Sequence, residues 1–263
     1  MTTTLDNIQR PAVGARRVRL IGEADLNWAL AQGWRDFGQN RGDILVLALL
    51  YPLIGFAAAA LCFDSDLAPL FFPLVSGLTI LGPAVASGFY EIARRRDAGL
   101  EASWTHFLDP LRRPGRAGLA VLTVGLTLLF ITWLCVAWLI ASATIGLTPG
   151  MSAAEFLRRV LDTPRGWTLI ALGNLAGLGF AAATLVFSLI SFPMVVDGGA
   201  DPVSAVLTSV HAVRANPRAT VSWGLRVAGL LVLGCLPAFM GLAIVLPVLG
   251  YATWRLYTRL VVR

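Results

Sequence analysis

The chain has 263 residues, of which 57% are hydrophobic and 14% charged, and its mean hydropathy is +0.73. Soluble domains carry about a quarter of charged residues, so a soluble globular fold is excluded. The net charge is +6 and the chain contains no lysine, which excludes a P-loop lysine, a Schiff-base lysine and a lysine general base. The composition therefore indicates an integral membrane protein.

The arginines lie in short segments between apolar runs, where positive charge sets membrane orientation. We therefore expect no nucleic-acid partner, and expect the lipid bilayer and other membrane proteins instead. Exclusive use of arginine is typical of a GC-rich bacterial genome, so the predicted location is the bacterial inner (cytoplasmic) membrane.

The polar, aperiodic residues 1–22 predict a disordered cytoplasmic segment, followed by a single integral membrane domain over 23–263. The predicted class is an all-α, polytopic bundle, since several apolar runs reach the ~20 residues that cross a hydrocarbon core. The predicted spans are residues 44–63, 70–92, 119–141, 167–196, 219–237 and 239–259.

The last apolar stretch, residues 219–262, leaves two topologies open. As one long helix it gives five spans and places the C-terminal arginines outside. As a hairpin turning near residues 236–238 it gives six spans and keeps both chain ends in the cytoplasm. The positive-inside rule favours six, although segment 142–166 then carries three arginines on the outer side.

A threefold pattern accompanies these spans. Short amphipathic segments at 26–37, 100–111 and 203–213 precede the three predicted hairpins on the cytoplasmic side. The second span of each hairpin contains one proline: Pro83, Pro193 and Pro247. This pattern predicts three copies of one unit, an interfacial helix followed by a hairpin, against the alternative of chance similarity among apolar runs.

Three motifs resemble a known family. They are Gly33-Trp34-Arg35-Asp36-Phe37, the helix end at 81–91, and the closing run Leu246-Pro247-Val248-Leu249-Gly250-Tyr251-Ala252-Thr253-Trp254-Arg255-Leu256-Tyr257. Together they resemble the bacterial integral membrane proteins grouped as domain of unknown function 2189, over roughly Ala24 to the C-terminus. That family commonly has histidine where this chain has Tyr251 and Arg255. The resemblance implies the architecture and no mechanism, since the family has no established activity.

Arg226 is the main candidate for an intramembrane polar site. It lies two turns into the fifth predicted span, roughly 12 Å from its start at 1.5 Å per residue. Its guanidinium either snorkels to the headgroups or pairs with a carboxylate at the same level, for which Glu91, Asp197 and Asp201 are the candidates. Both explanations are structural, and we prefer them to a substrate site.

Small and polar residues in other spans are packing candidates. Gly173 and Gly177 flank Asn174 in a G-x-x-x-G pattern, which lets helix backbones approach while an amide bridges them. The three prolines would each free a carbonyl and kink a span, either without function or around a transport cavity.

No catalytic motif, metal-binding spacing or nucleotide loop is present, so we expect no enzyme activity, metal or cofactor. The leading hypothesis is a non-enzymatic membrane scaffold, assembly or modulatory component. The alternative is a small-solute or lipid transporter built from kinked hairpins. An intramembrane lipid enzyme using Glu91 or Asp197 ranks third.

Overall fold

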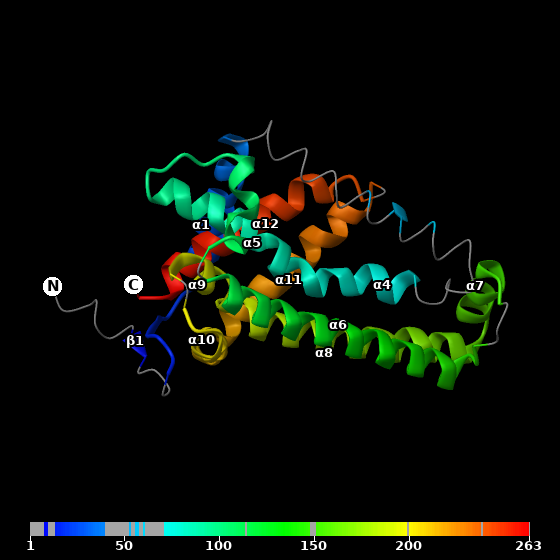
Figure 1. Cartoon of the computed structure of the whole chain (residues 1–263). Coiled ribbons are helices and arrows are strands. Elements are labelled where there is room, and N and C mark those ends of the chain that lie inside the picture. Colours follow the sequence, from blue (N-terminus) through cyan, green and yellow to red (C-terminus); the bar gives the residue numbers. More distant parts are fainter. Residues whose placement is uncertain are drawn as a thin grey trace. The chain divides into compact units, whose positions relative to one another are not determined.

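The computed structural model describes residues 8–9, 14–39, 53, 56–57, 60, 71–113, 115–147, 151–198, 200–237 and 239–262. This part of the chain is helical, apart from a two-residue antiparallel pair of Ile8–Gln9 (β1) with Val18–Arg19 (β2). The helices, in chain order (Figure 1), are α1 Glu23–Gln39, α4 Phe71–Leu78, the 3-10 turn η2 Thr79–Leu81, α5 Gly82–Asp97, the 3-10 helix η3 Trp104–Leu111, α6 Arg116–Thr144, α7 Ala153–Asp162, α8 Pro164–Ser188, α9 Ser191–Gly198, α10 Pro202–Ala215, α11 Pro217–Cys235 and α12 Leu242–Leu260.

The chain forms two compact units. The first contains Met1–Pro52, Pro83–Thr123 and Leu185–Arg263, and the second contains Leu53–Gly82 and Val124–Thr184.

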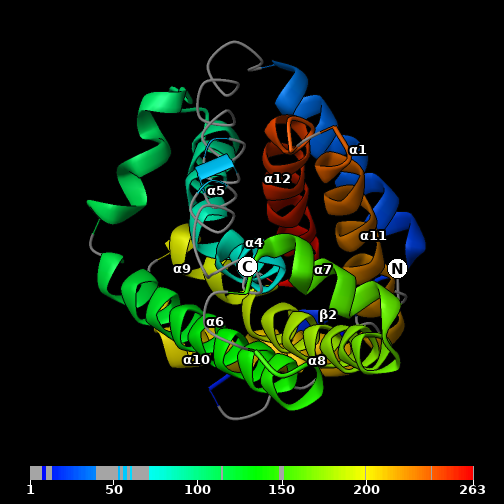
Figure 2. The same ribbon diagram turned by 90° about the vertical axis from the view of Figure 1, so that its right-hand side faces the viewer.

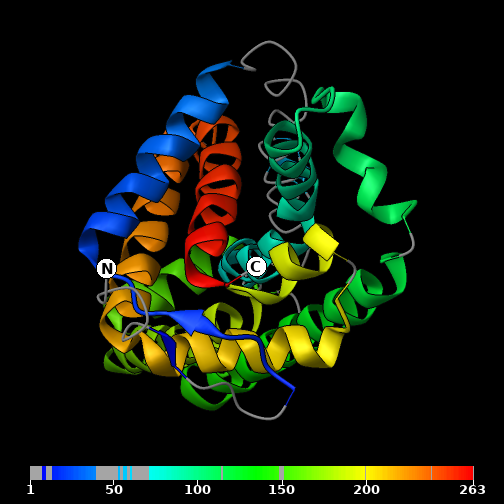
Figure 3. The same ribbon diagram turned by 90° about the vertical axis from the view of Figure 1, so that its left-hand side faces the viewer.

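Helix α12 carries much of the core of the first unit. Its side chains Tyr251, Trp254 and Tyr257 are fully buried. Helix α1 packs along α12, and α11 lies beside both (Figures 2 and 3). The approach of α1 depends on Gly33, because a Cβ there would stand only 2.7 Å from the backbone nitrogen of Ala252.

Each amphipathic segment packs on the second helix of a hairpin. The segments before the second and third hairpins pack on the hairpin that precedes them, and the segment before the first hairpin packs on the third. The Phe107 ring of η3 lies against Gly88 of α5, with its centre 5.0 Å from that of Phe89. Helix α10 packs on α9 and α1 packs on α12. The three predicted amphipathic segments therefore all bury one side against the second helix of a hairpin.

The second unit is organised around Trp133 of α6. Its indole nitrogen donates to the carbonyl of Pro73 in α4 at 2.8 Å, and its ring centre lies 5.5 Å from that of Phe180 in α8. Gly77 of α4 lies against the same indole, and a Cβ at Gly177 of α8 would stand 3.4 Å from it. The Trp133 side chain thus packs α6 against both α4 and α8.

Among the described residues, three helical stretches are long and apolar enough to cross a membrane: Phe71–Asp97, Arg116–Thr144 and Pro164–Gly198. They coincide with the second, third and fourth predicted spans. The first predicted span, 44–63, lies almost wholly outside the described residues. The 19-residue helices α11 and α12 are not among the three, so the six-span model stays a prediction.

The last apolar stretch folds as two helices joined by a turn between Cys235 and Leu242, not as one long helix. Phe239 takes a positive φ of 66°, and its amide donates to the carbonyl of Cys235 at 3.1 Å. Gly234 and Gly241 lie side by side where the two helices meet. The hairpin expected near residues 236–238 is therefore present in the structure.

Within the segment 1–22, for which the sequence predicts disorder, residues 14–22 bond to distant helices, and residues 1–7 and 10–13 lie outside the described residues. The amide of Arg16 donates to the Thr208 hydroxyl at 3.0 Å, and that of Ile21 donates to the Asn216 side chain at 2.8 Å. Val18 is fully buried. These partners lie nearly 200 residues away, so local composition carries no sign of them.

Two of the predicted proline kinks follow an interruption of the helix. The turn η2 precedes Pro83, and a break at residues 189–190 precedes Pro193. At the second break the Ser209 hydroxyl of α10 accepts from the Ile190 amide at 3.2 Å and donates to the Val186 carbonyl at 2.7 Å. Helix α12 continues through Pro247, which is buried. A neighbouring helix therefore satisfies the backbone groups at the second break.

Candidate functional site

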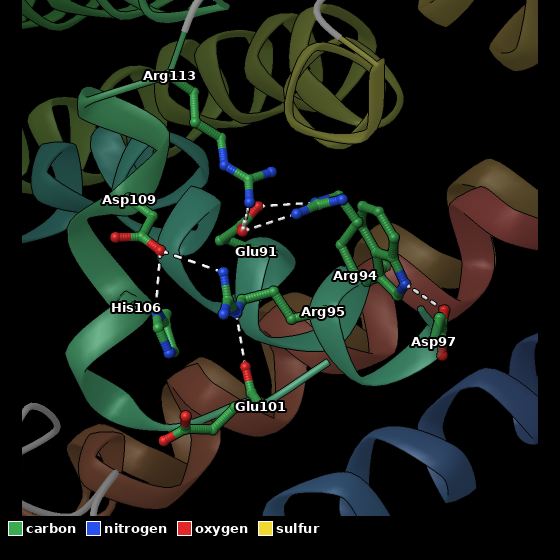
Figure 4. Close-up of polar contacts among 9 residues, drawn as sticks. Glu91, Arg94, Arg95, Asp97, Glu101, His106, Asp109 and Arg113 are labelled. Atoms are coloured by element: carbon green, nitrogen blue, oxygen red, sulfur yellow. Dashed lines mark hydrogen bonds and ion pairs between the residues drawn. The ribbon is translucent and has the colours of Figure 1, made fainter. Parts of the chain in front are cut away.

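The clearest cluster of charged residues surrounds Glu91, near the C-terminal end of α5 (Figure 4). The Glu91 side chain is 0% exposed and lies between two arginines. Arg94 donates to both carboxylate oxygens, at 2.8 and 2.9 Å, and Arg113 approaches one of them at 2.8 Å. Burial of an unpaired carboxylate costs several kcal/mol, so the two guanidinium groups are what permits Glu91 to stay buried.

A second carboxylate, Asp109, lies on the neighbouring helix η3. It approaches His106 Nδ1 at 2.9 Å and Arg95 at 3.5 Å, and Arg95 also donates to the Glu101 carbonyl at 2.6 Å (Figure 4). Arg95 thereby ties the segment between α5 and η3 to α5.

A third group of charges joins α1, α5 and α12. Asp36 of α1 accepts from Arg96 of α5 at 2.9 Å and from Arg255 of α12 at 2.7 Å. Arg255 also donates to Asp97 at 2.6 Å, and the Trp254 indole donates to the other oxygen of Asp97 at 2.9 Å. Asp36 is therefore shared by two helices from distant parts of the sequence.

Glu91 and Asp197, both named as candidates from the sequence, line one cavity of about 210 Å³. The Tyr257 hydroxyl donates to Asp197 at 2.8 Å. The lining residues are Glu91, Pro110, Arg113, Gly115, Leu119, Val195, Val196, Asp197 and Gly198. Two carboxylates and one arginine thus face a small, half-open space bordered by α5, the segment from η3 into α6, and the end of α9.

Arg226 has a carboxylate partner, but not one of the three expected. It pairs with Glu23 of α1 and donates to the Asn27 side chain at 2.7 Å. Glu91 is occupied by other arginines, and Asp201 caps α10 by accepting from the Ser204 amide at 3.0 Å. The sequence could not indicate Glu23, because only tertiary packing brings α1 beside α11.

The remaining candidates, Gly173, Asn174 and Gly177, belong to the second unit. The Asn174 amide donates within α8 to the Ile170 carbonyl at 2.8 Å, and among the described residues it bridges to no other helix. A Cβ at Gly173 would meet nothing within 4 Å, whereas one at Gly177 would contact Trp133. In the part of the chain that the structure describes, Gly177 of this G-x-x-x-G pair packs on another helix and Gly173 does not.

Sequence reasoning missed the paired positions Asp36, Arg96 and Arg113. Each lies in a segment that looks like an ordinary charged helix end, so only the cation-to-carboxylate matching between segments could have suggested them. No group of three His, Cys, Asp or Glu side chains suited to a metal ion occurs within the described ranges.

The comparisons with known proteins bear on the membrane assignment. Neither a curated protein nor a solved structure matches the chain. A family model described as "Predicted integral membrane protein (DUF2189)" matches residues 71–197. The match includes Glu91, Arg113 and Asp197, whereas α1, α11 and α12 lie outside it. It confirms the resemblance over residues 71–197, which include the helix end at 81–91 but neither of the other two motifs. The chain is an integral membrane protein similar, over residues 71–197, to this family of unknown function.

Proposed function

We propose that this protein is a non-enzymatic membrane scaffold that holds or modulates other membrane components. The observation that carries the proposal is that the buried carboxylates of the candidate site are paired with arginines. Glu91 and Asp36 are almost completely buried and each is paired with two arginines. The oxygens of a catalytic or ion-conducting carboxylate must be free for its substrate. Those of Asp36 instead join α1 to α5 and α12, and those of Glu91 are held by Arg94 of its own helix and by Arg113 between η3 and α6.

The exposed faces of the amphipathic segments are suited to contact with a bilayer interface and with partner proteins. On α1 the indole of Trp34 is exposed, and on η3 Trp104, Leu108 and Leu111 are exposed. Aromatic and aliphatic side chains on amphipathic helices favour the headgroup region of a membrane. An apolar patch rimmed by polar residues also marks protein contacts. We infer that the three segments are interfacial helices in three repeats of one unit.

Both chain ends are placed on the cytoplasmic side in this proposal. Val18 bridges to Val261 in an antiparallel pair, and the Val262 amide donates to the Arg17 carbonyl at 3.1 Å. Ends that pair with each other lie on one side of a bilayer, which supports an even number of crossings. The arginine-rich segments next to them favour the cytoplasm.

We further propose that the α11–α12 hairpin enters the membrane without crossing it. Arg226 pairs with the exposed Glu23, so this level of α11 lies outside the hydrocarbon. From Arg226 to Leu236 the helix rises roughly 15 Å at 1.5 Å per residue, about half of a ~30 Å core. The turn is apolar and its amides bond internally, as Phe239 and Leu242 show. Such a turn suits hydrocarbon.

The scaffold proposal is tested by a photo-reactive amino acid at Trp104, which is exposed on η3. Irradiation of native membranes is expected to give one reproducible protein adduct. The matched control is the same amino acid at Trp167, an exposed tryptophan of α8 outside the interfacial segments. Adducts with lipid alone at Trp104, or the same protein at both positions, would refute the proposal.

A small-solute transporter is the second candidate, because of the cavity that Glu91 and Asp197 share. Solute-driven currents in proteoliposomes would separate the two functions. Transport that Glu91→Gln abolishes in a folded protein supports the transporter. A silent wild-type protein across a panel of organic ions and sugars supports the scaffold.

A further inference from the structure

A shallow groove of about 650 Å³ lies along the exposed face of α11. Two rows at four-residue spacing line it, one polar and one apolar. The polar row is Arg218, Ser222 and Arg226, and the apolar row is Pro217, Val221 and Leu225.

The polar row is suited to a phosphate group. Arg218 is exposed, and Arg226 lies two turns further along, roughly 12 Å at 1.5 Å per residue, with the Ser222 hydroxyl between them. The bonds of Arg226 to Asn27 and Glu23 hold its guanidinium in place and leave further N–H donors. Glu23 offsets part of its charge, so Arg218 contributes the larger share of the attraction.

The apolar row continues beyond the groove toward the tip of the hairpin. Val221, Leu225, Val232 and Leu236 are all exposed along one side of α11. From Leu225 to Leu236 this row is roughly 16 Å long at 1.5 Å per residue, about the length of an acyl chain in one leaflet of a ~30 Å core. A soluble phosphate would leave the row uncovered, whereas a phospholipid covers it.

We propose that this groove binds an anionic phospholipid from the cytoplasmic leaflet. Its phosphate lies between Arg218 and Arg226 beside Ser222, and one acyl chain runs from Leu225 along Val232 and Leu236 toward the tip of the hairpin. Two cations on a lipid-facing helix complement a headgroup with net negative charge better than a zwitterionic one. The site lies beside the contact between α11 and α1, since Arg226 lines the groove and also pairs with Glu23.

The test is native mass spectrometry of the purified full-length protein with added lipid. We expect phosphatidylglycerol to bind with at least tenfold higher affinity than phosphatidylcholine. Arg218→Gln is expected to lower phosphatidylglycerol affinity about tenfold, since a hydrogen bond to a charged group contributes about that factor. The matched control is Arg214→Gln, which removes the same charge from an exposed position on α10 outside the groove. It should change affinity less than twofold.

A second variant separates the groove from general attraction. Ser222→Phe keeps both arginines and fills the space between them, and it should also lower phosphatidylglycerol affinity about tenfold. Unfolding curves of each variant establish that it is folded. If Arg218→Gln does not fold, the phosphatidylglycerol affinity of Ser222→Phe tests the proposal in its place.

Three results would overturn the proposal. Equal loss in Arg214→Gln and Arg218→Gln would mean surface attraction without a site. Displacement of the lipid by excess inorganic phosphate would mean a free-phosphate site. Equal binding of phosphatidylcholine would mean that the arginines do not select the headgroup.

Discussion

Replacing Gly33 with alanine is expected to push α1 away from α12. An added Cβ would stand 2.7 Å from three atoms: the Ala252 nitrogen, the Ala252 Cβ and the Val248 oxygen. Two of the three belong to the backbone of α12, which cannot rotate aside as a flexible side chain would. The whole of α1 must therefore shift.

The magnitude follows from two opposing effects. Alanine gains about 1 kcal/mol of helix propensity over glycine. Overpacking of a close contact costs typically 1–3 kcal/mol. The shift also stretches the ion pair of Asp36 with Arg255, which is 2.7 Å long in the structure. We expect a net destabilisation of about 1–2 kcal/mol.

The assay is reversible unfolding in mixed detergent micelles, followed by the fluorescence of buried tryptophans such as Trp254. The matched control is Gly229→Ala in α11, where an added Cβ meets nothing within 4 Å. That control should unfold at the same or a higher denaturant concentration than the parent. If Gly33→Ala is as stable as Gly229→Ala, the close approach of α1 to α12 is wrong.

Three further outcomes are expected. Asp36→Asn should destabilise the protein by about 2–3 kcal/mol in the same assay, less than for a fully buried pair because its two arginines keep partial solvation; unchanged stability would contradict the shared ion pair. A cysteine replacing Met240 at the hairpin tip should resist a membrane-impermeant maleimide added from outside, whereas Glu155→Cys on α7 should react. Labelling of Met240→Cys would mean that the hairpin crosses the bilayer. Gly173→Ala should leave stability within about 0.5 kcal/mol, since its Cβ meets open space; a larger loss would assign this glycine to an interface with another chain.

Some parts of the fold were predictable because they are local. The long apolar runs predict spans at 119–141 and 167–196, which the structure contains as α6 and as α8 followed by α9. The amphipathic pattern predicts α1 and α10 in the same way, and the Asp201-Pro202 start of α10 is a local capping signal.

The candidate site was predictable only in part. Glu91 and Asp197 stand out as acidic residues at the ends of apolar helices, and the structure brings both to one cavity. Their partners do not stand out. Arg113 and Tyr257 are ordinary residues of their own segments, and only the packing of helix ends shows what they bind.

The sequence alone determined that this protein is helical and lies in a membrane, because hydropathy and helix length depend on consecutive residues. Only the tertiary structure decided which arginine pairs with which carboxylate. Asp36 pairs with Arg255 and Glu23 with Arg226 across about two hundred residues of chain. Any arginine in this chain could satisfy any carboxylate in principle, and the choice depends on which helices pack together. That packing follows from close contacts such as Gly33 on Ala252, which no local pattern specifies.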